Sequence, residues 1–174
     1  DGELCWISAG DDAPPRSLAD TAVRETLRAA LTARRGRLVF AAPGEQVRLL
    51  SLPVSPEEKK HLDRALPFLI EEDVAQDIED VHVAHLSRGA EQVTAMLCSH
   101  ACMQRWQAAL AGLPRIESWV PEPLLLPWRS GEWCLAFDGD RAILRTGEAS
   151  GTAAETALLP VLLASLMARD GVPQ

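Results

Sequence analysis

Positive charge is scarce in this sequence. Its 174 residues include 17 lysines and arginines against 25 aspartates and glutamates, which gives a net charge of −8 at pH 7. A nucleic-acid-binding domain needs a basic face that neutralises phosphates, so the charge balance argues against nucleic acid as a partner. The same balance argues against docking on an anionic membrane surface.

Long hydrophobic runs are also missing. The longest, 156–168, has 13 residues and contains Pro160, whereas a membrane-spanning helix needs about 20 apolar residues. The amino-terminal residues Asp1-Gly2-Glu3 lack the basic and apolar regions of a signal peptide. We therefore expect no membrane-spanning segment and no signal peptide within these residues.

Catalytic and cofactor motifs are absent as well. The sequence has no G-x-S-x-G elbow, no Walker loop and no G-x-G-x-x-G fingerprint. The spacing of its four cysteines favours a reducing compartment over a disulfide framework. Cys98, His100 and Cys102 form a metal-like cluster that His82 or His85 could complete only by a close approach. Zinc usually takes four ligands from two separated pairs, so we interpret the cysteines as buried small residues. We predict no enzyme, and no catalytic, cofactor-binding or metal-binding residue.

What the sequence does contain is an alternation of strand-like and helix-like segments. Hairpin-length links, among them Arg88-Gly89 and Asp138-Gly139-Asp140, join several of the strands. This pattern predicts an α/β fold with mixed sheets rather than a pure βαβ repeat. Strands are expected at 4–8, 37–42, 46–52, 81–86, 92–97, 116–120, 133–137 and 142–145. Pro121, Pro123 and Pro127 predict an extended connection.

The clearest helix start is Ser55-Pro56-Glu57-Glu58, which combines a capping box with proline at the first helical position. At about 100° per residue, Leu62, Leu66 and Leu69 share one face, and the apolar residues from Ile70 onward lie on another. Because Pro67 stands between the two sets and proline disrupts a helix interior, we predict two helical segments, 56–66 and 68–79, broken at Pro67. Replacing Pro67 with alanine should then bring little gain in stability.

An acidic segment follows. Six carboxylates within ten residues, 71–80, carry most of the net charge. Asp73, Asp77 and Asp80 would form one row on a helix, where like charges repel by a few tenths of a kcal/mol per pair. The row is either a solvated face, with Arg48, Arg64 or Arg88 as internal neutralisers, or a docking surface for a basic partner. A Mg²⁺-dependent nuclease site is a third interpretation, which no other feature supports. The candidate partner-binding residues are Glu71, Glu72, Asp73, Asp77 and Asp80.

The carboxyl-terminal helix is unusually apolar. Thr152-Ala153-Ala154-Glu155 resembles a capping box, and the leucines that follow cover nearly all faces of the helix. A helix of this kind is normally buried on most sides. Either it closes the core, or its outer face packs against something that this chain lacks.

Three stretches of the sequence resemble the cytoplasmic region of the GspL family, the inner-membrane platform proteins of type II secretion systems. They are 43–53 (PGEQVRLLSLP), 64–82 (RALPFLIEEDVAQDIEDVH), and 121–127 (PEPLLLP) together with 131–133 and 141–147. The resemblance implies an actin-like fold of RNase H-like lobes, related to PilM of type IV pili. It also implies a scaffold without catalytic activity that recruits the secretion ATPase GspE to the inner membrane.

The resemblance further implies a domain plan and additional partners. Residues 1–44 and 95–130 would form the first lobe, 45–94 an inserted subdomain, and 131–174 the start of a truncated second lobe. A later transmembrane helix outside this chain would hold the protein in the bacterial inner membrane and leave this region cytoplasmic. Parts outside the chain would also contact GspM and other platform proteins, and the family tends to form homodimers.

The alternative function is a nucleotide-binding actin-like switch. Such a switch needs phosphate loops of the D-x-G-[ST] type in both lobes. Ser8-Ala9-Gly10-Asp11 and Asp138-Gly139-Asp140 lie at suitable places, but neither has the full pattern. This departure favours a fold used for binding rather than for ATP hydrolysis, and calorimetry with Mg-ATP separates the two functions.

Overall fold

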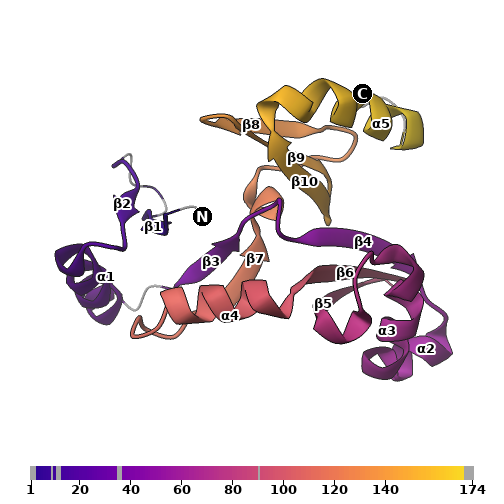
Figure 1. The fold of residues 1–174 in the computed structure, drawn as a ribbon, viewed down its shortest axis with the longest axis horizontal. Coiled ribbons are helices and arrows are strands. Elements are labelled where there is room, and N and C mark those ends of the chain that lie inside the picture. Colours follow the sequence, from indigo (N-terminus) through magenta and orange to yellow (C-terminus); the bar gives the residue numbers. More distant parts are fainter. Residues whose placement is uncertain (1–2, 9, 11–12, 35–36, 90, 171–174) are drawn as a thin grey trace. The chain divides into compact units, whose positions relative to one another are not determined.

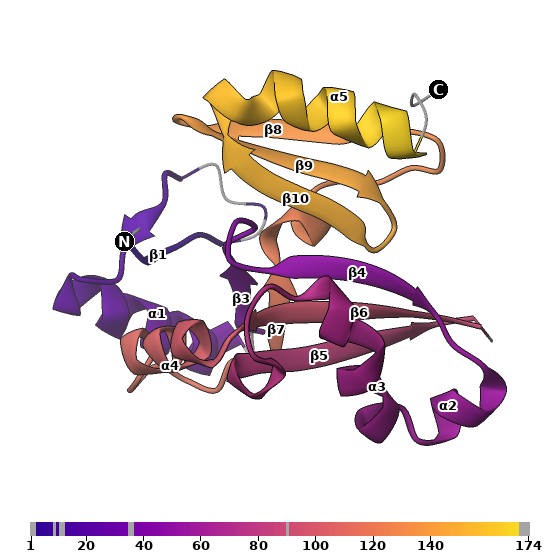
Figure 2. The same ribbon diagram turned by 45° about the vertical axis from the view of Figure 1, so that its right-hand side comes forward.

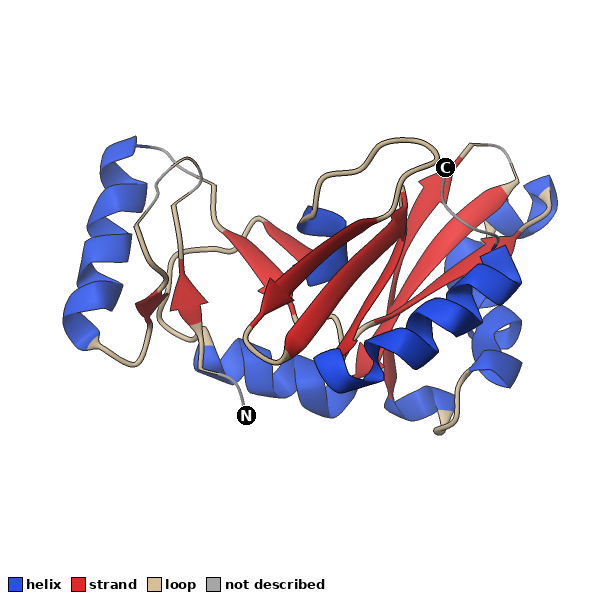
Figure 3. Ribbon diagram, turned by 90° about the horizontal axis from the view of Figure 1, so that it is seen from above, coloured by secondary structure: helices blue, strands red, loops and turns tan. Residues whose placement is uncertain are grey.

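The computed structural model describes residues 3–8, 10, 13–34, 37–89 and 91–170. The chain divides into two compact units, one of Asp1–Phe40 with Gln104–Trp119 and the other of Ala41–Met103 with Val120–Gln174. Figure 1 shows the elements, and Figure 3 shows that helices and strands are interleaved along the chain. The mixed α/β class expected from the sequence is therefore confirmed. The division into 1–44 with 95–130, 45–94 and 131–174 stays a prediction.

The first unit contains short strands, helical residues and an aromatic cluster. β1 (Cys5–Trp6) pairs antiparallel with β2 (Arg16–Ser17), and α1 spans Thr21–Arg34. Phe40 lies between Trp106 and Trp119, with ring centroids 5.4 and 4.8 Å away. Arg24 and Arg28 of α1 donate to carbonyls at Ala109, Ala111 and Gly112. They satisfy acceptors that the end of a helix leaves without intrahelical partners.

The chain passes between the two units within three elements. These are β3 (Val39–Ala42), α4 (His100–Ala109) and β7 (Ser118–Pro121). β3 and β7 form a two-stranded sheet. The Ser99 hydroxyl accepts the backbone N–H of Cys102 at 3.1 Å and so caps α4.

The first sheet of the second unit is antiparallel, in the order β4 (Arg48–Pro53), β6 (Gln92–Ser99), β5 (Val81–Arg88). Gly89 in the β5–β6 turn has φ +59°, which confirms the hairpin expected there. Short helices α2 (Pro56–Lys60) and α3 (Leu62–Ile70) lie beside this sheet in Figure 2. The expected capping box at Ser55 is present, with Ser55 and Glu58 bonding each other's backbone N–H groups.

The second sheet of this unit has the antiparallel order β10 (Ser150–Glu155), β9 (Arg141–Gly147), β8 (Cys134–Asp138). α5 (Leu159–Asp170) runs along it after the short 3₁₀ helix η4 (Thr156–Leu158). The expected hairpin at Asp138-Gly139-Asp140 is confirmed, with Gly139 at φ +60°. The capping box expected at 152–155 is wrong, because these residues pair with β9 as part of β10.

Two further expectations are corrected around this sheet. Glu122–Leu125 form a 3₁₀ helix, η3, in place of a fully extended connection, because Pro123 fits its first turn. α5 is not buried on most sides: Leu166 is buried, whereas Val161 and Met167 are 72% and 37% exposed. Of the two interpretations of α5, closure of the core therefore accounts for its inner face alone.

The expected helix break at Pro67 is wrong. The break lies at His61, whose φ of −127° and ψ of 32° are not helical, and Pro67 lies inside α3. α3 continues past Pro67 because Leu62, Leu66 and Ile70, spaced by four residues, all enter the core. The carbonyl that loses its helical bond to residue 67 belongs to Asp63, an exposed residue that water can reach.

We expect Pro67→Ala to raise the free energy of unfolding by about 2 kcal/mol. Alanine restores a helical N–H donor and is about 3 kcal/mol better than proline in a helix interior. The greater freedom of the unfolded chain offsets about 0.4–1 kcal/mol of this gain. Urea unfolding measures the change, with Pro56→Ala at the first position of α2 as the matched control, because proline is well accommodated there. Equal changes in the free energy of unfolding of the two variants would contradict the position of Pro67 inside α3.

Candidate functional site

The acidic segment does not form a helical row. Glu71–Asp73 make the 3₁₀ helix η1, Val74 is extended, and a second 3₁₀ helix, η2, spans Ile78–Asp80. The expectation that Asp73, Asp77 and Asp80 share one helix face is therefore wrong. Val74 and Ile78 both pack against the core of the β4–β6–β5 sheet, and they do so from a segment that is extended at Val74, so the helical spacing of the three aspartates is lost.

All five candidate partner-binding residues in this segment are exposed to solvent. Two of them also have structural contacts. Arg48 donates to the backbone carbonyl of Asp73 and lies 3.5 Å from its carboxylate. Arg48, one of the three arginines considered as internal neutralisers, therefore pairs with the acidic segment. The Asp77 carboxylate accepts the backbone N–H of Glu79 at 3.1 Å and caps η2. Glu71 and Glu72 therefore offer the clearer test of a docking role.

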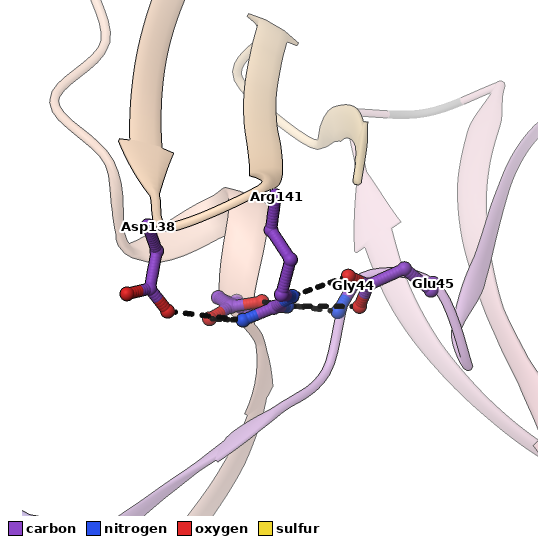
Figure 4. Close-up of polar contacts among 5 residues, drawn as sticks. Gly44, Glu45, Asp138 and Arg141 are labelled. Carbon is purple, nitrogen blue, oxygen red and sulfur yellow. Dashed lines mark hydrogen bonds and ion pairs between the residues drawn. The ribbon is translucent and has the colours of Figure 1, made fainter. Parts of the chain in front are cut away.

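A second polar site surrounds Arg141, the first residue of β9 (Figure 4). Its guanidinium bonds Glu45 at 2.5 and 2.9 Å, Glu122 at 2.6 Å and Asp138 at 3.3 Å. The backbone N–H of Gly44 donates to Glu122 at 3.2 Å. Arg141 thus holds together three segments of the second unit: the chain before β4, η3 and the β8–β9 hairpin.

The charges of this Arg141 cluster perturb one another. The Arg141 hydrogen bond lowers the pKa of Glu45 below its ordinary value, and the bond to Glu45 raises the pKa of Arg141. Three carboxylates face one guanidinium, which leaves an excess of negative charge beside the hairpin. That excess disfavours a bare phosphate group beside Asp138-Gly139-Asp140. The other loop considered for phosphate, Ser8 to Asp11, lies partly outside the described residues.

Cys98 lies near Cys102, and His82 lies near His100, in the region of the metal-like cluster noted in the sequence. Burial and the nearby Cys102 raise the pKa of the Cys98 thiol to about 11. The ring of His82 lies 5.9 Å from that of His100, and burial together with His100 lowers the pKa of His82. Within the described part of the chain, no three metal-ligating side chains converge on one point.

Sequence reasoning missed two residues of interest, Arg141 and Phe68. Arg141 has no local signal, because Glu45 precedes it by 96 positions and Glu122 by 19. Phe68 on α3 is 78% exposed. The helical spacing could have indicated this exposure, because Phe68 lies about 200° around the helix from both Leu66 and Ile70.

Comparison with known proteins agrees with this architecture. Residues 5–173 match the family model of the type II secretion system protein L. The chain belongs to the type II secretion system protein L family. Type II secretion system protein L of Vibrio cholerae is 29% identical over 136 residues, which cover 76% of this chain and 32% of that protein. The Dickeya chrysanthemi protein is 27% identical over 124 residues, which cover 70% and 31%.

A solved structure of this family has the same fold. It is the cytoplasmic domain of EpsL, an inner-membrane component of the type II secretion system of Vibrio cholerae. It matches with a TM-score of 0.62 and 26% identity, over 81% of this chain and 60% of that one. The actin-like α/β architecture expected from the resemblance is therefore confirmed.

The match to the protein L relatives is partial in length. The chain spans about a third of the curated relatives that it matches. Among the residues that the structure describes, no helix has both the length and the hydropathy needed to cross a bilayer.

Proposed function

We propose that this chain is a non-catalytic cytoplasmic scaffold of a type II secretion system, which recruits the secretion ATPase GspE to the inner-membrane platform. Membership of the protein L family supports a role in type II secretion. The relatives are named as secretion-system components rather than as enzymes. The EpsL domain, which comes from an inner-membrane component, supports a place on the cytoplasmic side of that membrane.

The observation that carries this proposal is the exposed acidic segment, 71–80. It holds six carboxylates and no basic residue, and Glu71, Glu72, Asp73, Asp77 and Asp80 all face solvent. A concentrated charge of one sign raises the association rate of an oppositely charged partner and fixes its register. In this proposal a basic surface in the amino-terminal region of GspE docks here.

The further partners in the proposal involve more than this chain. GspM and other platform proteins would bind parts of the longer relatives that have no counterpart here, and a transmembrane helix in those parts would anchor the protein. Homodimer formation is part of the same proposal. A nucleotide-binding switch is less well supported, because the negative excess of the Arg141 cluster lies beside the loop that would contact phosphate.

We expect Glu71→Lys with Glu72→Lys to weaken binding of GspE by more than twofold, chiefly through slower association, and to reduce its dependence on salt. Charges at the edge of an interface act on the association rate, and salt screens them. Surface plasmon resonance at several salt concentrations measures both effects. These two residues are preferred to Asp73 and Asp77, whose side chains have structural contacts.

The matched control is Glu25→Lys with Glu91→Lys, which changes the net charge equally at two exposed positions elsewhere. We expect this control to bind like the unmodified chain at moderate salt. Affinities within twofold of each other for both pairs, a difference of about 0.4 kcal/mol, would show that the acidic segment is only a solvated surface. Failure of the unmodified chain to bind GspE would reject the proposed function itself.

A further inference from the structure

Phe68 has the highest exposure among the large apolar side chains on the described surface, at 78%. It lies on α3, whose buried residues Leu62, Leu66 and Ile70 all face the core. At about 200° from Leu66 and from Ile70, Phe68 points to the opposite side of the helix. The ring therefore contributes little to the core of the β4–β6–β5 sheet, and the fold gives no reason for an aromatic residue at this position.

The surroundings of Phe68 distinguish it from an isolated surface apolar residue, which by itself is ordinary. Glu71 and Glu72 follow it by three and four positions, one turn further along, and both are exposed. They belong to η1, which follows α3 directly, so they come one turn after Phe68. An exposed aromatic ring with a carboxylate edge has the composition of a binding surface, in which an apolar centre supplies affinity and charges at the rim supply orientation.

We propose that Phe68 is the apolar anchor of a docking surface rimmed by Glu71 and Glu72. The occupant is an amphipathic helix of a partner protein whose aliphatic face is bordered by arginine or lysine. Charge complementarity favours this occupant, because the segment 71–80 has a charge of −6 and would attract a basic border on the partner. The proposal rests on the proposed function, because it assigns this helix to GspE.

The chain allows a direct test, because it contains only three phenylalanines. Incorporation of 4-fluorophenylalanine gives one ¹⁹F resonance each for Phe40, Phe68 and Phe137, which are 6%, 78% and 60% exposed. We expect the amino-terminal region of GspE to shift or broaden the Phe68 resonance and to leave Phe137 unchanged. Assignment comes from Phe68→Leu and Phe137→Leu variants.

Affinity supplies the second measurement. Phe68→Ala should weaken GspE binding at least tenfold, mainly through faster dissociation and with little change in salt dependence. The matched control is Phe137→Ala, a replacement of the same kind at another exposed position, and it should stay within twofold. A rim charge and an apolar anchor thus have different kinetic effects. The charge acts mainly on the association rate, and the buried apolar contact acts mainly on the dissociation rate.

A synthetic basic amphipathic peptide of leucine and lysine separates this inference from the proposed function. Its counterpart with glutamate in place of lysine is the control. If GspE does not bind but the basic peptide selectively shifts Phe68, the proposed function fails and the docking surface stands. If GspE binds while Phe68→Ala leaves the affinity within twofold, the anchor is rejected and recruitment stands. If neither GspE nor the basic peptide shifts Phe68, the inference is overturned.

Discussion

Arg141→Ala is expected to lower the free energy of unfolding by about 2–3 kcal/mol. The replacement leaves Glu45 and Glu122 facing each other without their shared cation, and removing one member of a buried pair costs about 3–5 kcal/mol. Arg141, Glu45 and Glu122 are 32%, 33% and 23% exposed, so water screens part of this loss and the expected value is smaller. Urea unfolding followed by tryptophan fluorescence measures it.

Two comparisons sharpen the Arg141 experiment. Arg129 is 82% exposed and lies 3.9 Å from Glu132, so Arg129→Ala should cost less than about 0.5 kcal/mol. Adding Glu45→Gln and Glu122→Gln to Arg141→Ala should recover part of the stability, because the uncompensated charges are removed. A loss of the same size in Arg129→Ala, or no recovery in the triple variant, would show that the cluster is not stabilising.

The contribution of the Glu45–Arg141 pair also depends on pH in a defined direction. The folded-state pKa of Glu45 lies below its unfolded value, so the folded state favours the ionised carboxylate. The stabilisation is complete above the unfolded pKa, near 4.5, and is lost as pH falls through the folded pKa. The stability difference between the unmodified chain and Arg141→Ala should therefore shrink below pH 4.5.

Gly151→Ala is expected to lower the free energy of unfolding by about 2–3 kcal/mol, because β10 approaches its neighbours too closely for a side chain. A Cβ at position 151 would lie 2.7 Å from the backbone carbonyl of Leu144 and 2.7 Å from Cβ of Pro123. The carbonyl belongs to β9 and Pro123 is fully buried, so neither can move without disturbing the sheet. Overpacking of this kind costs about 1–3 kcal/mol.

Gly147→Ala is the matched control for Gly151→Ala. A Cβ at position 147 would meet the hydroxyl of Ser150 at 3.0 Å, and that side chain can rotate away. We expect its loss to be less than about 1 kcal/mol. Thermal and urea unfolding of both variants measure the difference, and an unchanged stability for Gly151→Ala would contradict the close packing of β10 against η3.

Local signals predicted most of the fold. The capping box at Ser55, the β5–β6 turn and the Asp138-Gly139-Asp140 hairpin are encoded within a few residues, and each is present. The error at Pro67 has a tertiary origin. Burial of Ile70 at 0% exposure outweighs the lost hydrogen bond, and the helical spacing of residues 73–80 was assumed where the chain is extended at Val74.

The candidate site was only partly accessible to sequence reasoning. Composition alone located the acidic segment and its charge, because both are properties of a short stretch. The Arg141 cluster was not accessible, because its members come from three distant segments that only the folded chain brings together. Phe68 was not singled out from the sequence, because its exposure depends on what the remaining chain covers.

The order of the two units along the chain has a consequence for synthesis. The first unit needs residues up to Trp119, whereas the β4–β6–β5 sheet is complete once Ser99 has been made. On a ribosome that adds about 5–20 residues per second, this sheet and its helices can fold as one contiguous segment. At that stage residues 104–119, the second part of the first unit, have not yet been made. The helix α1 is thus made before the β4–β6–β5 sheet, but the residues of 104–119 that share its unit are made only after that sheet.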